Sequence, residues 1–304
     1  MIAPNPAAIL QFLLDGARCG IDGTLITLTG ITGASSRGIG TQMAVLADGR
    51  HLGSFSGGCI ESAVIAEAQD TLVHDTARTV RFGSGSPYID IRLPCGGGID
   101  LAFTPRPDAA RLADVLERLA RRQPAQLRLD GALIRDYVPP LRLIAMGHGE
   151  DLVALTRLAQ AYGVDVLAFA PESDIQACAA GGITLLTTRT ALPELQGDAW
   201  SAFVFLFHDA EWEEFLLPQA LALPGFYHGA VGSARTHRAR IASLRAAGVP
   251  ADQLGSLRGT IGLIPATRDP ATLALSILGE LVQDYQACAG APQLAFAAAA
   301  PDQD

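Results

Sequence analysis

The chain has 304 residues, of which 49% are hydrophobic and 17% are charged, and its formal net charge is -9. This length and composition are typical of a globular protein with room for two domains, and the negative charge argues against a nucleic-acid partner, whose phosphates it would repel. All 22 basic residues are arginine, which excludes a lysine Schiff base, a pyridoxal phosphate anchor and a P-loop lysine.

The cysteines are few and widely spaced. There are five, at positions 19, 59, 95, 178 and 288, and no two form a Cys-x-x-Cys pair. An odd number at this spacing favours free thiols in a reducing compartment over a disulfide framework. The N-terminal stretch lacks the basic residues of a signal peptide, and no apolar run approaches the roughly 18 residues that span a bilayer. We therefore expect a cytoplasmic protein that binds no membrane.

The first part of the chain, residues 1–136, is rich in strand patterns and glycine turns. Alternating apolar residues predict strands at 24–31 and 41–47, and Asp-Gly-Arg after the second predicts a hairpin turn. Helical spacing occurs near 9–13, at 60–72 and, as a clear amphipathic pattern, at 107–122. We expect a sheet-rich N-terminal α/β domain, with further strands at 76–82, 89–93 and 99–105.

A second domain is expected over residues 137–288. The Pro-Pro sequence at 139–140 predicts an extended linker, after which buried strands alternate with helices. Strands are expected at 141–146, 164–171 and 202–207, and helices at 150–163, 211–221, 233–247 and 271–285. This alternation predicts a Rossmann-like, doubly wound parallel sheet. Residues 289–304 have no periodicity and are expected to be a tail.

A glycine turn follows the first strand of this second domain. Gly147 and Gly149 lie between that strand and a helix, where backbone N–H groups suit an anion. The pattern departs from a dinucleotide turn, because Leu152 occupies the third glycine position. Ala170 and Pro171 stand where a ribose-binding acid is usual. We therefore favour a phosphate-bearing ligand over a nicotinamide dinucleotide.

Polar residues follow two later elements of the second domain. His208 and Asp209 come directly after a buried strand, so they are either functional groups at the carboxyl edge of the sheet or a helix cap with a polar neighbour. Arg235 lies near the Gly232 turn and is the best phosphate partner of its helix. Most of the basic residues along that helix, among them His237, Arg238 and Arg240, are expected to form a solvated face.

Two short stretches, Ser-Gly-Gly-Cys-Ile-Glu at 56–61 and Pro-Cys-Gly-Gly-Gly-Ile at 94–99, each place a cysteine beside glycines. Cys59 is expected at the start of a helix, where the positive helix end favours a thiolate. Cys95 lies in a glycine loop. Either residue alone is commonly a small buried core residue, while a structural zinc lacks the further ligands it needs and a disulfide does not suit the compartment.

The remaining interpretation is a shared cleft that binds a flat, anionic ligand. The backbone of the flanking glycines would donate N–H groups to it, and one or both thiolates would face it. Arg37 would supply a nearby positive charge and Ser35 and Ser36 would supply hydroxyl donors, although Arg37 is equally consistent with an exposed turn residue. The glycines concerned are Gly57, Gly58, Gly96 and Gly97.

Six blocks of sequence, in order along residues 24–285, give the chain a family resemblance. They are TGASSRGIGTQMAV, GSFSGGCIE, SPYIDIRLPCGGGIDL, LIAMGHG, HGAVGSARTHRARIASLRAAGV and LRGTIGL followed by DPATLALSILGELV. With these blocks the chain resembles the XdhC/CoxI family. The resemblance implies a maturation chaperone, often a homodimer and without steady turnover. Such a chaperone binds molybdenum cofactor (molybdopterin, with or without an added nucleotide), assists its sulfuration by a cysteine desulfurase, and delivers it to a xanthine dehydrogenase or aldehyde oxidase-type molybdoenzyme.

The resemblance also implies site residues. Cys59 and Cys95 match the family's two glycine-cysteine motifs and would be soft ligands in contact with molybdenum. Arg37 matches the arginine of a Ser-Ser-Pro-Arg motif, with Ser36 in place of proline. Segments 169–173 and 262–266 lack the family's usual aspartates, which weakens the case for nucleotide chemistry in the second domain.

Two rival interpretations remain open from the sequence. One is an NAD(P)-dependent oxidoreductase that uses the Rossmann-like domain, with His208 as acid or base. The other is a scaffold that brings a desulfurase and a molybdoenzyme together without using the cysteines.

Overall fold

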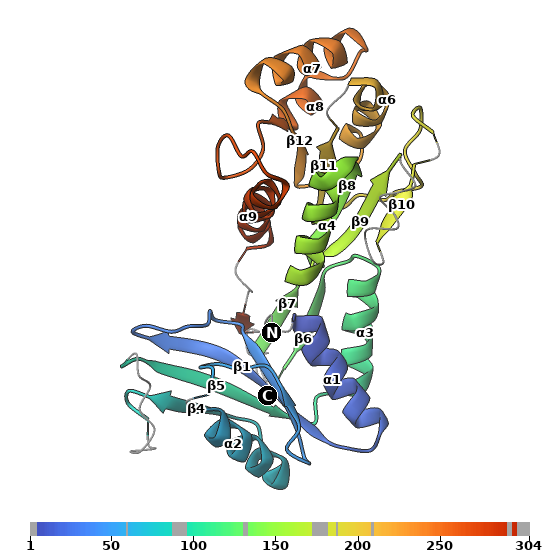
Figure 1. Cartoon of the computed structure of the whole chain (residues 1–304). Coiled ribbons are helices and arrows are strands. Elements are labelled where there is room, and N and C mark those ends of the chain that lie inside the picture. The colour runs from blue at the N-terminus through green and yellow to red at the C-terminus, as the bar shows by residue number, and fades with distance from the viewer. Residues whose placement is uncertain are drawn as a thin grey trace, which may run out of the picture. The chain divides into compact units, whose positions relative to one another are not determined.

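The computed structural model describes residues 5–58, 60–86, 96–129, 133–171, 182–186, 188–207, 210–290 and 294–296. The chain divides into two compact units (Figure 1). The first comprises Met1–Pro139 with Gly290–Asp304, and the second comprises Pro140–Ala289. The division after Pro139 falls within the Pro-Pro sequence.

The first unit is built on an antiparallel sheet of five strands in the order β3-β2-β1-β5-β4. A second sheet of three strands has the order β14-β7-β6. The elements of this unit are α1 (Pro6–Arg18), β1 (Gly23–Thr32), β2 (Gln42–Leu46), β3 (His51–Leu52), α2 (Glu61–His74), β4 (Arg78–Gly83), β5 (Gly98–Pro105), α3 (Ala109–Ala120), β6 (Ala125–Arg128), β7 (Leu133–Tyr137) and β14 (Leu294–Phe296).

Both faces of the five-stranded sheet are covered, and the strand alternation explains how. Leu25 of β1 packs in one core with apolar residues of α1 and α3, whereas Ile26 and Leu28 pack in another with α2. Side chains of a strand alternate between its two faces, so this strand contributes to both cores. The expectation of a sheet-rich α/β domain is confirmed.

Residues 294–296, which the sequence assigns to a tail, form β14 and pair antiparallel with β7. Leu294 packs against the core shared with α1 and α3. A three-residue strand is too short to show periodicity, so its pairing depends on a partner far away in sequence. The predicted strand at 89–93 lies outside the described residues.

The second unit is a parallel sheet of six strands in the order β10-β9-β8-β11-β12-β13. Helices α4 and α9 pack on one face, and α6, α7 and α8 on the other. This confirms the doubly wound sheet. Its elements are β8 (Arg142–Gly147), α4 (Gly149–Tyr162), β9 (Asp165–Ala170), β10 (Ile183–Leu185), β11 (Ser201–Leu206), α6 (Ala210–Leu221), β12 (Tyr227–Ala230), α7 (Ala234–Ala246), α8 (Ala251–Ser256), β13 (Leu257–Gly259) and α9 (Pro270–Ala289).

No helix among the described residues combines the length and apolar character that crossing a lipid bilayer requires.

A buried ion pair joins three elements of the second unit. Arg240 of α7 donates from Nε and Nη2 to the Glu213 carboxylate of α6, at 2.7 and 2.8 Å, and from Nη2 to the Val231 carbonyl at 2.8 Å. The two side chains are only 5% and 8% exposed. Arg240 is therefore an exception to the solvated face expected for this helix, because periodicity alone does not reveal a carboxylate on a neighbouring helix.

Glu213→Gln should destabilise the second unit by about 3 kcal/mol, because it leaves a buried guanidinium without its counter-charge. Urea denaturation followed by circular dichroism measures the change. Glu214→Gln, which alters an exposed neighbour on the same helix, is the matched control and should change stability by less than about 0.5 kcal/mol. Equal stability of the two variants would contradict the role given to the pair.

Candidate functional site

The glycine-rich loops of the first unit gather at one end of its five-stranded sheet. Because neighbouring strands are antiparallel, β1 ends there, β2 begins there, β3 and β4 end there and β5 begins there. We call this region the glycine-loop end. Its described residues are 33–41, 53–58, 60, 83–86 and 96–98.

Both predicted cysteines belong to segments that reach this end, but Cys59 and Cys95 themselves lie outside the described residues. Gly58 and Ile60 flank Cys59, and Gly96 follows Cys95. The prediction that the two thiols line one cleft remains a prediction.

The loop after β1 lies against both glycine-cysteine segments. A Cβ added to Gly97 would be 2.4 Å from the Ala34 carbonyl oxygen and 2.9 Å from that of Thr32. On the other side, the Ser36 hydroxyl donates to the carbonyl of Phe55 at 3.2 Å. This loop therefore connects the segment before Cys59 to the segment after Cys95.

Arg37 is half-buried in that loop and is held by backbone oxygens. Its Nε donates to the Ser54 carbonyl at 3.3 Å, and its Nη1 lies 3.4 Å from the Ser36 carbonyl. Among the described residues, Arg37 forms no ion pair. The Ser35 hydroxyl is used locally, because it donates to the Arg37 carbonyl at 2.9 Å and accepts from the Arg37 N–H at 3.2 Å.

Arg81, by contrast, is already compensated at the same end of the sheet. Its Nη1 donates to both oxygens of Asp100 at 3.0 Å. Its Nη2 donates to the Thr32 hydroxyl at 2.7 Å, and its Nε donates to the Ser84 carbonyl at 2.8 Å. Arg81 joins β4, β5 and β1 and has a carboxylate partner, whereas the described partners of the Arg37 side chain are carbonyl oxygens.

Glu61, the first residue of α2, is the functional residue that sequence reasoning missed. Seven donors among the described residues lie within hydrogen-bonding distance of its carboxylate. They are the hydroxyls of Ser54 and Ser56, each at 2.7 Å, and the N–H groups of Phe55 at 3.1 Å, Ser56 at 2.9 Å, Gly57 at 3.2 Å, Gly58 at 2.8 Å and Ile60 at 3.2 Å. The signal in the sequence is a glutamate three residues after a Gly-Gly pair, at the expected start of a helix.

The turn can enclose this carboxylate because of its two glycines. Gly57 has a φ of 75° and Gly58 a φ of 132°, both in the left-handed region that favours glycine. Their N–H groups, predicted to donate to an anionic ligand, are directed toward the carboxylate of Glu61 in the same chain. A ligand phosphate would use these two groups only by displacing Glu61.

The pKa of Glu61 reflects two opposing causes. Partial burial raises this pKa. The hydrogen bonds from the Ser56 N–H, the Ser56 hydroxyl and the Ser54 hydroxyl together lower it by a larger amount, so that the pKa falls to about 2. The side chain is therefore ionised throughout the physiological range.

In the second unit, the backbone geometry explains why positions 147 and 149 are glycine. A Cβ on Gly147 would be 2.7 Å from the Leu206 carbonyl oxygen, so Gly147 allows β8 and β11 to approach closely. Gly149 starts α4 with a φ of 75°. Leu152, at the third glycine position, is fully buried in the core. His208 and Asp209 lie outside the described residues.

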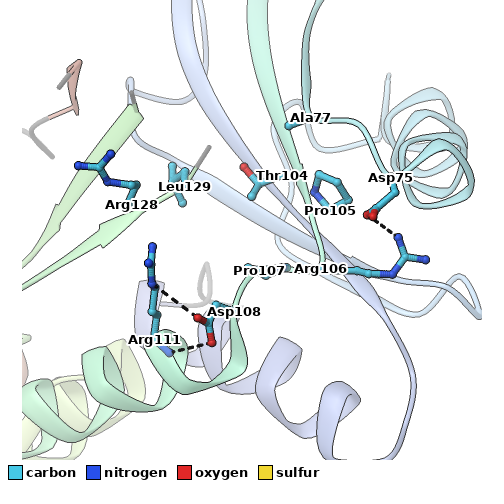
Figure 2. Close-up of a pocket in the computed structure, with 10 residues that line it drawn as sticks. All are labelled: Asp75, Ala77, Thr104, Pro105, Arg106, Pro107, Asp108, Arg111, Arg128 and Leu129. Carbon is cyan, nitrogen blue, oxygen red and sulfur yellow. Dashed lines mark hydrogen bonds and ion pairs between the residues drawn. The ribbon is translucent and has the colours of Figure 1, made fainter. Parts of the chain in front are cut away.

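A cavity of about 230 Å³ lies at the opposite end of β5 from the glycine-loop end (Figure 2). Arg106 in its wall pairs with Asp75 at 2.7 Å and with Asp22, and Arg111 lies 3.6 Å from the Asp108 carboxylate. These charges are compensated within the chain. Within the described part of the chain, no group of three or more His, Cys, Asp and Glu residues could hold a metal ion.

Comparison with known proteins identifies the family. Residues 17–83 match the model of the XdhC and CoxI family, and residues 143–281 match that of the XdhC Rossmann domain. The molybdenum cofactor insertion chaperone PaoD of Escherichia coli strain K12 is 34% identical over 292 residues, which cover 90% of this chain and 86% of PaoD. The chain belongs to the XdhC and CoxI family.

A solved structure supports the fold of this XdhC/CoxI-family protein. The crystal structure of a xanthine dehydrogenase from Bacillus halodurans superposes with a TM-score of 0.73 at 20% identity, over 91% of this chain and 96% of that one. The first family match includes Arg37, Gly57, Gly58 and Glu61. The glycine-loop end therefore lies largely within the segment that defines the family.

Gly97→Ala should destabilise the first unit by about 1–3 kcal/mol, because the added methyl group meets backbone oxygens that have little freedom to move. Thermal unfolding measures the loss. Gly38→Ala, in the loop after β1, is the control: no atom lies within 4 Å of the added Cβ, so stability should stay the same or rise slightly. A tolerated Gly97→Ala would show that the two loops do not need this contact.

Glu61→Gln should lower the free energy of unfolding at pH 7 by about 1–3 kcal/mol, because the hydrogen bonds to a charged acceptor are lost. The folded-state pKa is depressed from 4.5 to about 2, so the stabilisation is complete above pH 4.5 and disappears as the pH falls through about 2. Urea denaturation across this range should therefore show the two proteins converging in acid. If the two proteins differ in free energy of unfolding by the same amount at every pH, the depressed pKa of Glu61 is not the source of the stabilisation.

Proposed function

We propose that this protein binds molybdenum cofactor at the glycine-loop end and delivers it to a molybdoenzyme of the xanthine dehydrogenase or aldehyde oxidase type. The observation that carries the proposal is that one loop, 33–37, contacts both Ser54 and Phe55, in the segment before Cys59, and Gly97, in the segment after Cys95. The name and similarity of the chaperone PaoD support the cargo and the delivery step.

The chemistry of this end suits a ligand with a phosphate and a soft metal centre. Arg37 has no carboxylate partner among the described residues, and a guanidinium forms strong, charge-assisted hydrogen bonds with phosphate. Gly96 is exposed and has open space at its Cβ position, so its backbone is accessible to a ligand. Cys59 and Cys95 would supply thiolates to molybdenum and its sulfur ligands.

The proposal extends to further steps and partners. A cysteine desulfurase would supply the sulfur that is added to the bound cofactor, and the second unit would dock the recipient enzyme or hold a nucleotide portion of the cofactor. The protein would act in the cytoplasm as a homodimer and as a carrier without steady turnover.

Protein purified from a molybdopterin-producing host should carry pterin, detected as its fluorescent oxidation product. Cys59→Ala and Cys95→Ala should each reduce the pterin content about ten-fold, since ligand-contacting groups at such sites typically contribute this much to binding. Cys19→Ala and Cys288→Ala are matched controls, because both thiols are free and exposed in the described structure. They should leave the pterin content unchanged.

Unchanged pterin in both Cys59→Ala and Cys95→Ala would remove the thiols from the mechanism and favour a scaffold. Wild-type protein without pterin that is stabilised by NAD or NADP would favour the oxidoreductase, because a ligand at one hundred times its Kd stabilises by roughly 2.7 kcal/mol.

A further inference from the structure

The turn that precedes α2 is stabilised by hydrogen bonds to the Glu61 carboxylate rather than by side-chain packing. Its ends are anchored, because Phe55 and Ile60 are buried in the core beneath α2. Between them, Gly57 and Gly58 are exposed, and no atom lies within 4 Å of their Cβ positions. Every described N–H group from Phe55 to Ile60 lies within hydrogen-bonding distance of the Glu61 carboxylate, and those of Gly57 and Ile60 are shared with the hydroxyls of Ser54 and Ser56.

The number of donors shows how completely the turn surrounds this carboxylate. An ionised carboxylate has about four acceptor sites, and seven donors lie within 3.2 Å of the Glu61 oxygens. Hydrogen bonds to a charged acceptor are stronger than neutral ones, so removal of the carboxylate would release the whole turn. The N–H groups would then be satisfied by water in other conformations.

The opposite side of the same backbone holds Arg37. The N–H groups of Phe55 and Ser56 are directed toward Glu61, while the carbonyls of Ser54 and Phe55 accept from Arg37 and Ser36. A peptide that rotates to release Glu61 also moves the carbonyl on its other face, because the peptide unit is planar. The carboxylate therefore determines where the Arg37 loop rests.

We propose that Glu61 is a positioning residue of the glycine-loop end, which holds Arg37 in place for a ligand anion through the backbone of residues 54–56. The inference depends on the proposed function for the identity of the ligand. Glu61 does not bind the cofactor itself; it supplies the internal negative charge around which the turn folds.

The test compares Glu61→Ala with wild type and with Asp114→Asn, which removes one exposed carboxylate from α3 of the same unit. Glu61→Ala should carry about ten-fold less pterin, the loss typical of groups that orient ligand-binding residues. Formate at about 100 mM should occupy the vacated N–H groups and restore part of the pterin content, whereas chloride at equal ionic strength should not. Asp114→Asn should lose no pterin and should not respond to formate.

Pterin content in Glu61→Ala equal to wild type would overturn the proposal, and so would a loss that formate leaves unchanged in folded protein. If Glu61→Ala folds only with an added anion, its folding yield is measured in formate and in chloride instead of its pterin content. Equal yields in the two salts would also overturn the proposal. Wild type without pterin would refute the proposed function alone, because the formate dependence of the melting temperature of Glu61→Ala still tests the role of Glu61.

Discussion

The close approach of two backbones determines the arrangement of the glycine-loop end. Gly97 lies against the carbonyl oxygens of Thr32 and Ala34 at a distance that leaves no room for a Cβ. That contact follows from the antiparallel pairing of β1 with β5, in which Thr32 lies opposite Gly98. Once this register is set, the loop after β1 lies beside the segment that contains Cys95, and its far side reaches the turn before α2.

The charged residues of the glycine-loop end differ in the partners that they have within the chain. Arg81 is neutralised by Asp100, and the N–H groups of the turn are directed toward Glu61. Arg37 is held by carbonyl oxygens only, among its described contacts. A ligand that brings a phosphate would therefore meet one available guanidinium rather than a general excess of positive charge. Under the proposed function, this arrangement lets a protein with a negative net charge recognise an anion.

Glycine has several distinct roles in this chain, and their differences matter for function. Gly147 allows β8 and β11 to approach, Gly57 and Gly58 adopt left-handed conformations around a carboxylate, and Gly97 permits a contact between loops. Gly57, Gly58, Gly96 and Gly149, all first assigned to ligand binding, combine a left-handed φ with open space at the Cβ position. The N–H groups of Gly57 and Gly58 are directed toward Glu61. A glycine motif is thus weak evidence for a ligand until its neighbours are known.

Local patterns in the sequence were enough to predict the two-part organisation, the strand at 24–31, the amphipathic helix that ends near Ala120, and the parallel sheet of the second unit. The strand and the helix depend on residues within one element, so periodicity predicts them directly, and the parallel sheet follows from the alternation of such strands and helices along the chain. The resemblance to a family, carried by the same short blocks, pointed to Arg37 and the two cysteines. Only tertiary structure decided that β14 completes a sheet, that Arg240 is buried against Glu213, and that the donors expected to bind a ligand enclose Glu61. These features depend on contacts between segments that are far apart in the chain or on the direction of individual N–H groups, and neither is recorded in the spacing of apolar residues.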